Sequence, residues 1–363
     1  MDHAELLKAR KVYELTRLNQ LQAWFAQRLQ RPVQLEIIEG PALRNGFSGE
    51  TIFLRERCGL QSEKSYILRQ ESVGSEISFP PGGDFLLEAS VQQALGRRSR
   101  VPVPPILGIE SDETVIGRKF YVMNVVPGEV PCDNPGYHCA GSVAALSPGD
   151  RRELALSGVE MLGELATLDP KTLDVPGLWR AEAGRSEIEW DINYYRNFWL
   201  WAQEDLRYPR MDEALEWVRR NAPRNEPLTI SWGDARYGNI IFAHTRIAAL
   251  IDWEMVTLGS PEKDLSFWLI MDELYATMIA SRPLEGWPSE VESMRAFERR
   301  LGRSVDEDLL AFHRLFTAVR LTAIFARFVN IMRHRGAFPR DMTLDATAPV
   351  IRLLDRELRR VRS

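Results

Sequence analysis

Three polar residues stand at fixed separations in the second half of the chain: Asp234, Asn239 five positions later, and Asp252 thirteen positions after that. Two apolar runs, 240–242 and 247–251, lie between Asn239 and Asp252 and predict two strands joined by a turn. An Asn and an Asp held across such a hairpin offer oxygen ligands, which Mg²⁺ prefers. The spacing therefore predicts a phosphate-transferring site, with Asp234 as the general base and Asn239 and Asp252 as metal ligands.

The separations resemble those of the protein kinase catalytic loop, where an Asp meets the substrate hydroxyl and an Asn and a later Asp hold the metals. The wording Gly-Asp-Ala-Arg-Tyr-Gly-Asn from position 233, followed by Ile-Asp-Trp-Glu from position 251, resembles the aminoglycoside phosphotransferase and choline kinase-like family. The branch that it resembles includes kinase domains fused to acyl-CoA dehydrogenases. This resemblance implies ATP and Mg²⁺ as cofactors and a small-molecule hydroxyl as the acceptor.

One position departs from the family's sequence motif. The family usually carries His two places before the catalytic Asp, and this chain has Trp232 there. The departure raises an alternative from another class, a pseudokinase that binds nucleotide without turnover. The presence of Asp234, Asn239 and Asp252 argues against that alternative.

The resemblance also implies the fold, which is α+β and protein kinase-like, with two lobes. Residues 1–126 are expected to form a small β-rich lobe, and residues 127–363 a larger, mostly helical lobe. Hydrophobic patterning and turn residues predict the elements of both lobes. We expect helices at 3–30, 84–95, 151–169, 187–205, 211–221 and 311–334, strands at 33–39, 51–57, 65–69, 106–109 and 119–126, and a long loop at 127–150.

Two parts of the first lobe are predicted to meet the phosphates. Gly46, Ser48 and Gly49 belong to a glycine turn between strands, where backbone N–H groups can approach phosphate oxygens, although an ordinary hairpin turn has the same signature. Arg69 ends the third strand, where the kinase fold places a phosphate-pairing Lys, and Glu88 is the expected partner of this cation. Arginine keeps the charge and changes the geometry of the contact.

The strand before the lobe boundary resembles the kinase hinge. The backbone groups of Met123, Asn124 and Val125 are expected to meet the adenine edge, while apolar side chains enclose the ring. A buried strand has the same pattern, and the two interpretations are compatible.

The acceptor is the least determined part of the site. An aminoglycoside, named by the resemblance, would need a carboxylate-lined pocket, and a hydroxyacyl-CoA or related alcohol is the alternative. The helix at 187–205 carries aromatic residues that favour core packing or, alternatively, an acceptor wall. The basic residues of the last long helix are expected to face solvent. The candidate carboxylates are Glu182, Glu187, Glu189, Asp191, Glu204, Asp205, Asp272 and Glu273, the aromatic residues are Trp190, Tyr194, Phe198 and Trp201, and the basic residues are Arg314, Arg320, Arg327, Arg333 and Arg335.

Composition narrows the class of partner. The 363 residues carry a net charge of −5, which gives no basic excess for a nucleic-acid partner. The three cysteines are scattered and odd in number, which favours reduced thiols in a cytosolic protein. We expect no apolar signal core and no run as long as a membrane span, and therefore a cytoplasmic protein without a membrane partner. The oligomeric state and the choice between ATP and GTP stay open.

Overall fold

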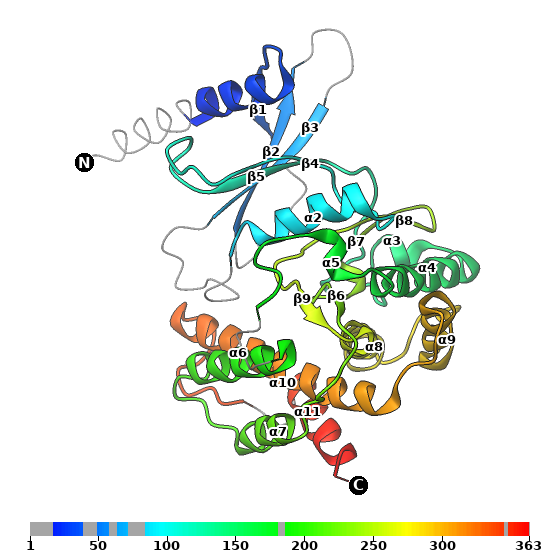
Figure 1. Ribbon diagram of the computed structural model, residues 1–363. Coiled ribbons are helices and arrows are strands. Elements are labelled where there is room, and N and C mark those ends of the chain that lie inside the picture. The colour runs from blue at the N-terminus through cyan, green and yellow to red at the C-terminus, as the bar shows by residue number, and fades with distance from the viewer. Residues whose placement is uncertain are drawn as a thin grey trace. The chain divides into compact units, whose positions relative to one another are not determined.

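The computed structural model describes residues 17–38, 49–57, 64–71, 84–180, 186–344 and 348–362 (Figure 1). The chain divides into two units. The first comprises Met1–Arg97 and Val103–Val126, and the second comprises Arg98–Pro102 and Pro127–Ser363. Of the predicted phosphate-binding turn, Gly46 and Ser48 lie outside the described residues.

An antiparallel sheet with the strand order β1-β2-β3-β5-β4 forms the centre of the first unit. Side chains alternate between its two faces, so every second residue of a strand reaches the core. Leu54 and Tyr66 point to one face, where they join Trp24 and Phe25 of the helical segment 17–29 in a hydrophobic core. The elements of this unit are β1 (Leu35–Ile38), β2 (Gly49–Glu56), β3 (Lys64–Glu71), α2 (Leu87–Arg98), β4 (Ile106–Glu110) and β5 (Phe120–Asn124).

Helices dominate the second unit, and α10 (Glu307–His334) packs against α6, α7, α8 and α11. Two short antiparallel pairs, β6 with β9 and β7 with β8, lie among the helices (Figure 1). The expected loop 127–150 contains the short helix α3. The other elements are α3 (Ser142–Ala145), α4 (Pro148–Ala166), α5 (Pro170–Leu173), α6 (Glu187–Ala202), α7 (Pro209–Arg220), β6 (Thr229–Ser231), β7 (Ile240–Ala243), β8 (Arg246–Leu250), β9 (Thr257–Gly259), α8 (Pro261–Glu273), the π-helical segment Leu274–Ile279, α9 (Glu290–Leu301) and α11 (Pro349–Arg360).

Two expectations about the last long helix need correction. The sequence analysis expects no run as long as a membrane span, but α10 is long and apolar enough to cross a membrane by length and composition. In the structure, 72% of its apolar window is buried inside the protein, as in a core helix. The expectation that its arginines face solvent is wrong for Arg314, Arg320 and Arg327, which are buried, whereas Arg333 is half-buried and Arg335 is exposed. Arg314 donates to Glu290 at 2.9 Å and Arg327 donates to Glu204 at 3.0 Å, so both charges have partners inside the protein.

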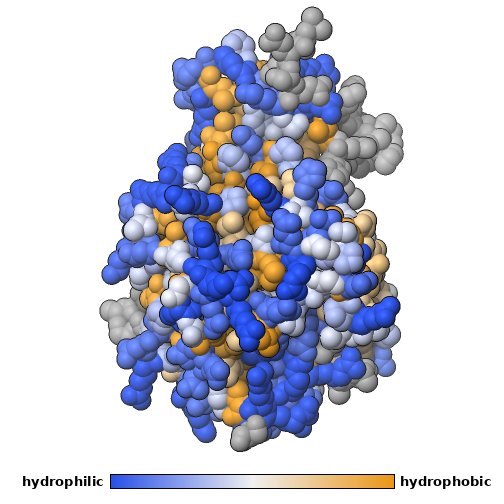
Figure 2. All heavy atoms as spheres, turned by 90° about the vertical axis from the view of Figure 1, so that its right-hand side faces the viewer, coloured by the Kyte–Doolittle hydropathy of each residue, from blue (hydrophilic) through white to orange (hydrophobic). Residues whose placement is uncertain are grey.

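The surface is mainly polar on the face drawn in Figure 2. Hydrophilic side chains cover most of this face, and hydrophobic side chains form small groups among them. Scattered apolar groups of this kind are normal for a globular protein.

Candidate functional site

The loop that carries Asp234 is anchored by a buried carboxylate. Asp264, in the first turn of α8, accepts hydrogen bonds from Ser231 Oγ (2.8 Å), Trp232 N (2.5 Å) and Gly233 N (3.0 Å). These three donors come directly before Asp234, at the end of β6. Asp264 therefore holds the loop through one side-chain and two backbone hydrogen bonds.

The Asp234 carboxylate is held from two sides. Its Oδ2 accepts from Asn239 Nδ2 at 2.6 Å and from Arg236 Nε at 3.1 Å, and the side chain is 17% exposed. Arg236 Nη1 also donates to both carboxylate oxygens of Asp133, at 2.7 and 2.8 Å. Burial disfavours the charge of Arg236, but Asp234 and Asp133 outweigh burial and raise the pKa of Arg236 well above its ordinary value. A permanent cation therefore lies beside the candidate base.

Asn239 and Asp252 lie on neighbouring chain segments. Asn239 ends a short 3₁₀ turn and precedes β7, and its carbonyl oxygen accepts from Ile251 N at 2.9 Å, one residue before Asp252. Because the amide nitrogen of Asn239 donates to Asp234, its Oδ1 is the atom that can meet a cation. Asp252 has a φ of 62°, an uncommon conformation for a residue with a side chain and one that occurs at functional sites.

The donor atoms suit Mg²⁺. Within the described ranges, no group of three or more His, Cys, Asp or Glu residues is arranged to hold a metal. Asn239 and Asp252 instead offer one amide oxygen and one carboxylate, and Mg²⁺ commonly completes such a set with substrate phosphates and water. The residues thus fit the predicted ion.

Trp232, at the position of the family His, connects two segments of the site. Its indole is fully buried, and Nε1 donates to the carbonyl oxygens of Ile251 (3.0 Å) and Asp252 (3.2 Å). The ring centroid lies 5.7 Å from that of Trp253. Trp232 therefore joins the segment before Asp234 to the segment that carries Asp252.

In the first unit, Arg69 and Glu88 form the expected ion pair. Arg69 Nη2 lies 3.8 Å from Glu88 Oε1, and both side chains are largely buried. Tyr121 on β5 donates its hydroxyl to the same oxygen at 2.8 Å. Gly49 does not belong to a turn, because it is the first residue of β2 and pairs with Glu71.

The predicted hinge residues lie at the end of a strand and directly after it. Met123 and Asn124 are the last residues of β5, a strand hydrogen-bonded on both sides. Asn124 N donates to Pro105 O at 2.9 Å, and Val125 N donates to Ser65 O at 3.1 Å. These two N–H groups have partners within the unit, and the contact of the backbone groups of Met123, Asn124 and Val125 with an adenine ring stays a prediction.

Most of the predicted acceptor carboxylates have partners inside the protein. Asp191 binds Lys263, and Asp205 accepts from both terminal nitrogens of Arg333. Arg333 lowers the pKa of Asp205 to about 2. The others behave alike: Glu189 caps α6 at Ser186, Glu204 pairs with Arg327 and His334, Asp272 accepts from Tyr137 and Trp287, and Glu273 pairs with Arg356. Glu182 lies outside the described residues.

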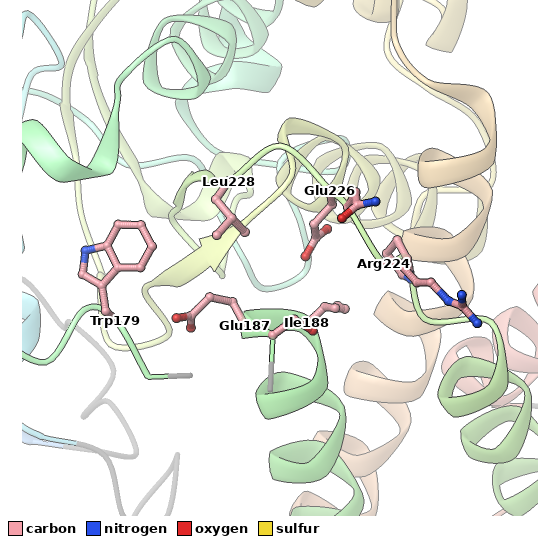
Figure 3. A pocket seen from close by; sticks show the side chains of 9 residues that line it. Trp179, Glu187, Ile188, Arg224, Glu226 and Leu228 are labelled. Carbon is pink, nitrogen blue, oxygen red and sulfur yellow. The ribbon is translucent and has the colours of Figure 1, made fainter. Parts of the chain in front are cut away.

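Glu187 borders a pocket of ≈ 300 Å³ at the start of α6 (Figure 3). Figure 3 shows Trp179, Glu187 and Glu226 around this hollow, with Leu228 beside them. Glu187 accepts from Arg180 N at 3.2 Å. Glu226 Oε2 pairs with His313 at 3.2 Å, while within the described residues Glu226 Oε1 is buried without a hydrogen-bond partner.

The aromatic residues of α6 do not share one environment. Phe198 is buried in the core, as the packing interpretation predicts, but Trp190 and Tyr194 are half-buried and Trp201 is exposed. The Trp190 and Tyr194 rings stack, with centroids 5.3 Å apart and planes inclined by 11°, and the Arg180 guanidinium lies over Trp190. Burial raises the pKa of Tyr194 further above its ordinary range.

Sequence reasoning missed Asp133 and the contact of Arg320 with the loop of Asp234. Asp133 reaches Arg236 from the segment before α3, about a hundred residues away in sequence, and Arg320 donates to Gly233 O at 2.6 Å from α10. Local spacing holds no signal for contacts of this range.

Comparison with known proteins agrees with this geometry. A profile of the phosphotransferase enzyme family matches residues 39–297, a range that includes Arg69, Glu88, Asp234, Asn239 and Asp252. Acyl-CoA dehydrogenase family member 11 from Homo sapiens is 32% identical over 228 residues, which are 61% of this chain and 26% of that protein. The chain thus spans about a quarter of the length of this relative.

Solved structures share the fold. A candidate aminoglycoside phosphotransferase from Ralstonia eutropha has a TM-score of 0.65 at 21% identity, with 94% of each chain covered. A thermostable mutant of aminoglycoside phosphotransferase APH(4)-Ia, in complex with ADP and hygromycin B, has a TM-score of 0.52 at 14% identity, with 93% of this chain and 97% of that chain covered. The expected α+β, kinase-like fold class is confirmed. Because the family profile matches well over half of this chain, the chain belongs to the phosphotransferase enzyme family.

Proposed function

We propose that this phosphotransferase is an ATP- and Mg²⁺-dependent kinase that transfers the γ-phosphoryl group to a hydroxyl of a small molecule in the cytoplasm. The observation that carries the proposal is the Asp234 carboxylate, which Asn239 and Arg236 hold at 2.6 and 3.1 Å. The ADP in the related APH(4)-Ia complex supports a nucleotide as the donor.

In this proposal, Asp234 orients the acceptor hydroxyl and takes its proton as the oxygen attacks the γ-phosphorus and the bond to the ADP oxygen breaks. Asn239 and Asp252 would hold Mg²⁺, which would neutralise charge on the phosphates when bound. Arg69, fixed by Glu88, would contribute a second positive charge to the phosphates. Positioning and charge neutralisation supply most of the rate in phosphoryl transfer.

The presence of Asp234, Asn239 and Asp252 argues against the pseudokinase alternative. Trp232 does not interrupt this set, because its indole connects the loop of Asp234 to the carbonyl groups of Ile251 and Asp252.

For the acceptor, we infer an uncharged or anionic alcohol, with a hydroxyacyl-CoA as the leading class. A polycationic aminoglycoside needs carboxylates that are free to bind it, whereas Asp205, Asp191 and Glu273 are paired with cations of the protein. The stacked rings of Trp190 and Tyr194 provide an apolar surface instead. The acyl-CoA dehydrogenase name of the 32% identical relative supports the same class.

An aminoglycoside remains the second candidate because of one specific observation. The pocket in Figure 3 carries Glu187 and Glu226, and one Glu226 oxygen lacks a hydrogen-bond partner in the described part of the chain. An amine of the acceptor could bind these carboxylates. Such binding should weaken steeply with salt, whereas binding of an acyl chain to aromatic rings should not.

The test is mass spectrometry of a mixed panel of aminoglycosides and hydroxyacyl-CoAs incubated with ATP, Mg²⁺ and the protein. We expect one phosphoryl group to be added to at least one hydroxyacyl-CoA. Addition to aminoglycosides alone would transfer the assignment to the second candidate. No addition to any compound, with ATP still binding, would favour the pseudokinase.

A further inference from the structure

Arg320 is a buried cation on α10. The side chain is 2% exposed, and its guanidinium carbon lies 5.1 Å from the Tyr195 ring centroid and 5.0 Å from that of Phe267. Removing such a charge from water is costly, and two aromatic faces offset only part of the cost. A buried charge of this kind therefore needs a strong polar partner.

The direct hydrogen bond of Arg320 goes to the peptide before Asp234. Nη2 donates to Gly233 O at 2.6 Å. Burial disfavours the charge of Arg320, but Tyr195, Asp191 and Asp264 outweigh burial and raise the pKa of Arg320 above its ordinary value. The side chain is therefore a cation, and its Nη2 holds one backbone carbonyl of the catalytic loop.

Gly233 is held at both of its polar groups. Its N–H donates to Asp264 at 3.0 Å, and its carbonyl accepts from Arg320, so an acid on α8 and a base on α10 bind the same residue. Gly233 has a φ of 89°, and a Cβ at this position would lie 2.0 Å from Met255 O. The residue therefore has a backbone conformation that only glycine can adopt here.

We propose that Arg320 is a positioning residue for phosphoryl transfer, which fixes the Gly233–Asp234 peptide and thereby the orientation of the Asp234 carboxylate. The Gly233 carbonyl and the Asp234 N–H belong to one planar peptide group. A donor that holds the carbonyl oxygen therefore also fixes the orientation of the Asp234 backbone N–H. Small displacements of a reacting group lower rates strongly. The inference rests on the proposed role of Asp234 as the base.

Arg327 provides a matched control on the same helix. It lies seven positions after Arg320, is also buried, and also places its guanidinium over an aromatic ring, at 4.0 Å from the Trp201 centroid. Among the described residues, its side chain donates to Glu204 and not to the catalytic loop. Replacing either arginine removes a buried cation, but only the change at Arg320 releases Gly233.

The test compares Arg320→Met, Arg320→Lys and Arg327→Met by thermal unfolding and by steady-state kinetics on the acceptor found in the panel. We expect Arg320→Met to lower kcat about 100-fold while the KM for ATP changes less than about threefold. Arg320→Lys, which keeps a donor for the carbonyl, should recover part of kcat. Arg327→Met should lose similar thermal stability with kcat within about threefold of the wild type.

Hydrogen exchange of the 231–239 segment gives a readout that does not depend on turnover. Arg320→Met should accelerate exchange of the Gly233 amide about tenfold or more, and Arg327→Met should not. Equal effects of the two variants on kcat and on exchange would overturn the inference.

The failure of the inference can be distinguished from the failure of the proposed function. If Asp234→Asn keeps full activity, the proposed function fails, while the exchange result still decides whether Arg320 holds the loop. If Arg320→Met does not fold, Arg320→Lys decides by the same two measurements.

Discussion

The indole nitrogen of Trp232 lies 3.2 Å from the carbonyl oxygen of Asp252. Trp232 comes two residues before the candidate base, and Asp252 is the candidate metal ligand, so one side chain links the two functions through the backbone. Family relatives usually place a His at this position. The larger indole fills a fully buried site and reaches both Ile251 and Asp252, which explains how the chain accommodates the change.

Trp232→Phe should separate this link from simple packing. The ring is kept, but both hydrogen bonds to the metal-ligand segment are lost, so we expect the KM for Mg²⁺-ATP to rise about tenfold and the free energy of unfolding to fall by about 2–3 kcal/mol. Trp199→Phe is the control, because Trp199 is equally buried and its Nε1 has no partner within the described residues. Equal changes in KM for the two variants would remove the special role of Trp232.

Calorimetry of ATP binding tests the metal ligands. The wild type should bind ATP at least about tenfold more tightly with Mg²⁺ than with EDTA, since Asn239 and Asp252 act on the nucleotide through the ion. Asp252→Asn should abolish most of this difference. Asp205→Asn, a change on a surface carboxylate paired with Arg333, should leave it intact. A wild type that binds equally well with and without Mg²⁺ would contradict the assignment.

Asp205 gives a prediction about pH. The hydrogen bond from Arg333 lowers the pKa of Asp205 to about 2, below its ordinary value of 3.8. The ion pair therefore contributes stability at pH values above the pKa of Asp205 in the unfolded chain. This contribution is lost as the pH falls from about 3.8 to about 2. Asp205→Asn should destabilise the protein at pH 6 and have little effect at pH 2, as measured by urea unfolding at both pH values. An equal loss at both would show that the ion pair is not responsible.

The elements that position the site could be predicted largely from local patterns. The two apolar runs predict β7 and β8 to within about one residue at either end. These strands depend on neighbours in sequence, so a sequence holds enough information to find them. The pairing of Arg69 with Glu88 is implied instead by the family resemblance.

What could not be predicted depends on contacts between distant segments. The arginines of α10 have the pattern of a solvated helix face, and only the packing of α6 and α8 around the helix shows that Arg320 is enclosed by Tyr195 and Phe267. The pairing of the carboxylates expected to bind an aminoglycoside could not be predicted either, because a count of acidic residues does not reveal that Asp191 is bound to Lys263. Composition indicates charge but not its partner.

The central claim is that Asp234 is the base for phosphoryl transfer, and one variant tests it most directly. Asp234→Asn keeps the shape of the side chain and removes its ability to take a proton. We predict that kcat on the acceptor found in the panel falls about 1,000-fold or more, while the Kd for Mg²⁺-ATP, measured by calorimetry on the same preparation, stays within about threefold of the wild-type value. An unchanged kcat, or a Kd that rises as much as kcat falls, would contradict the claim.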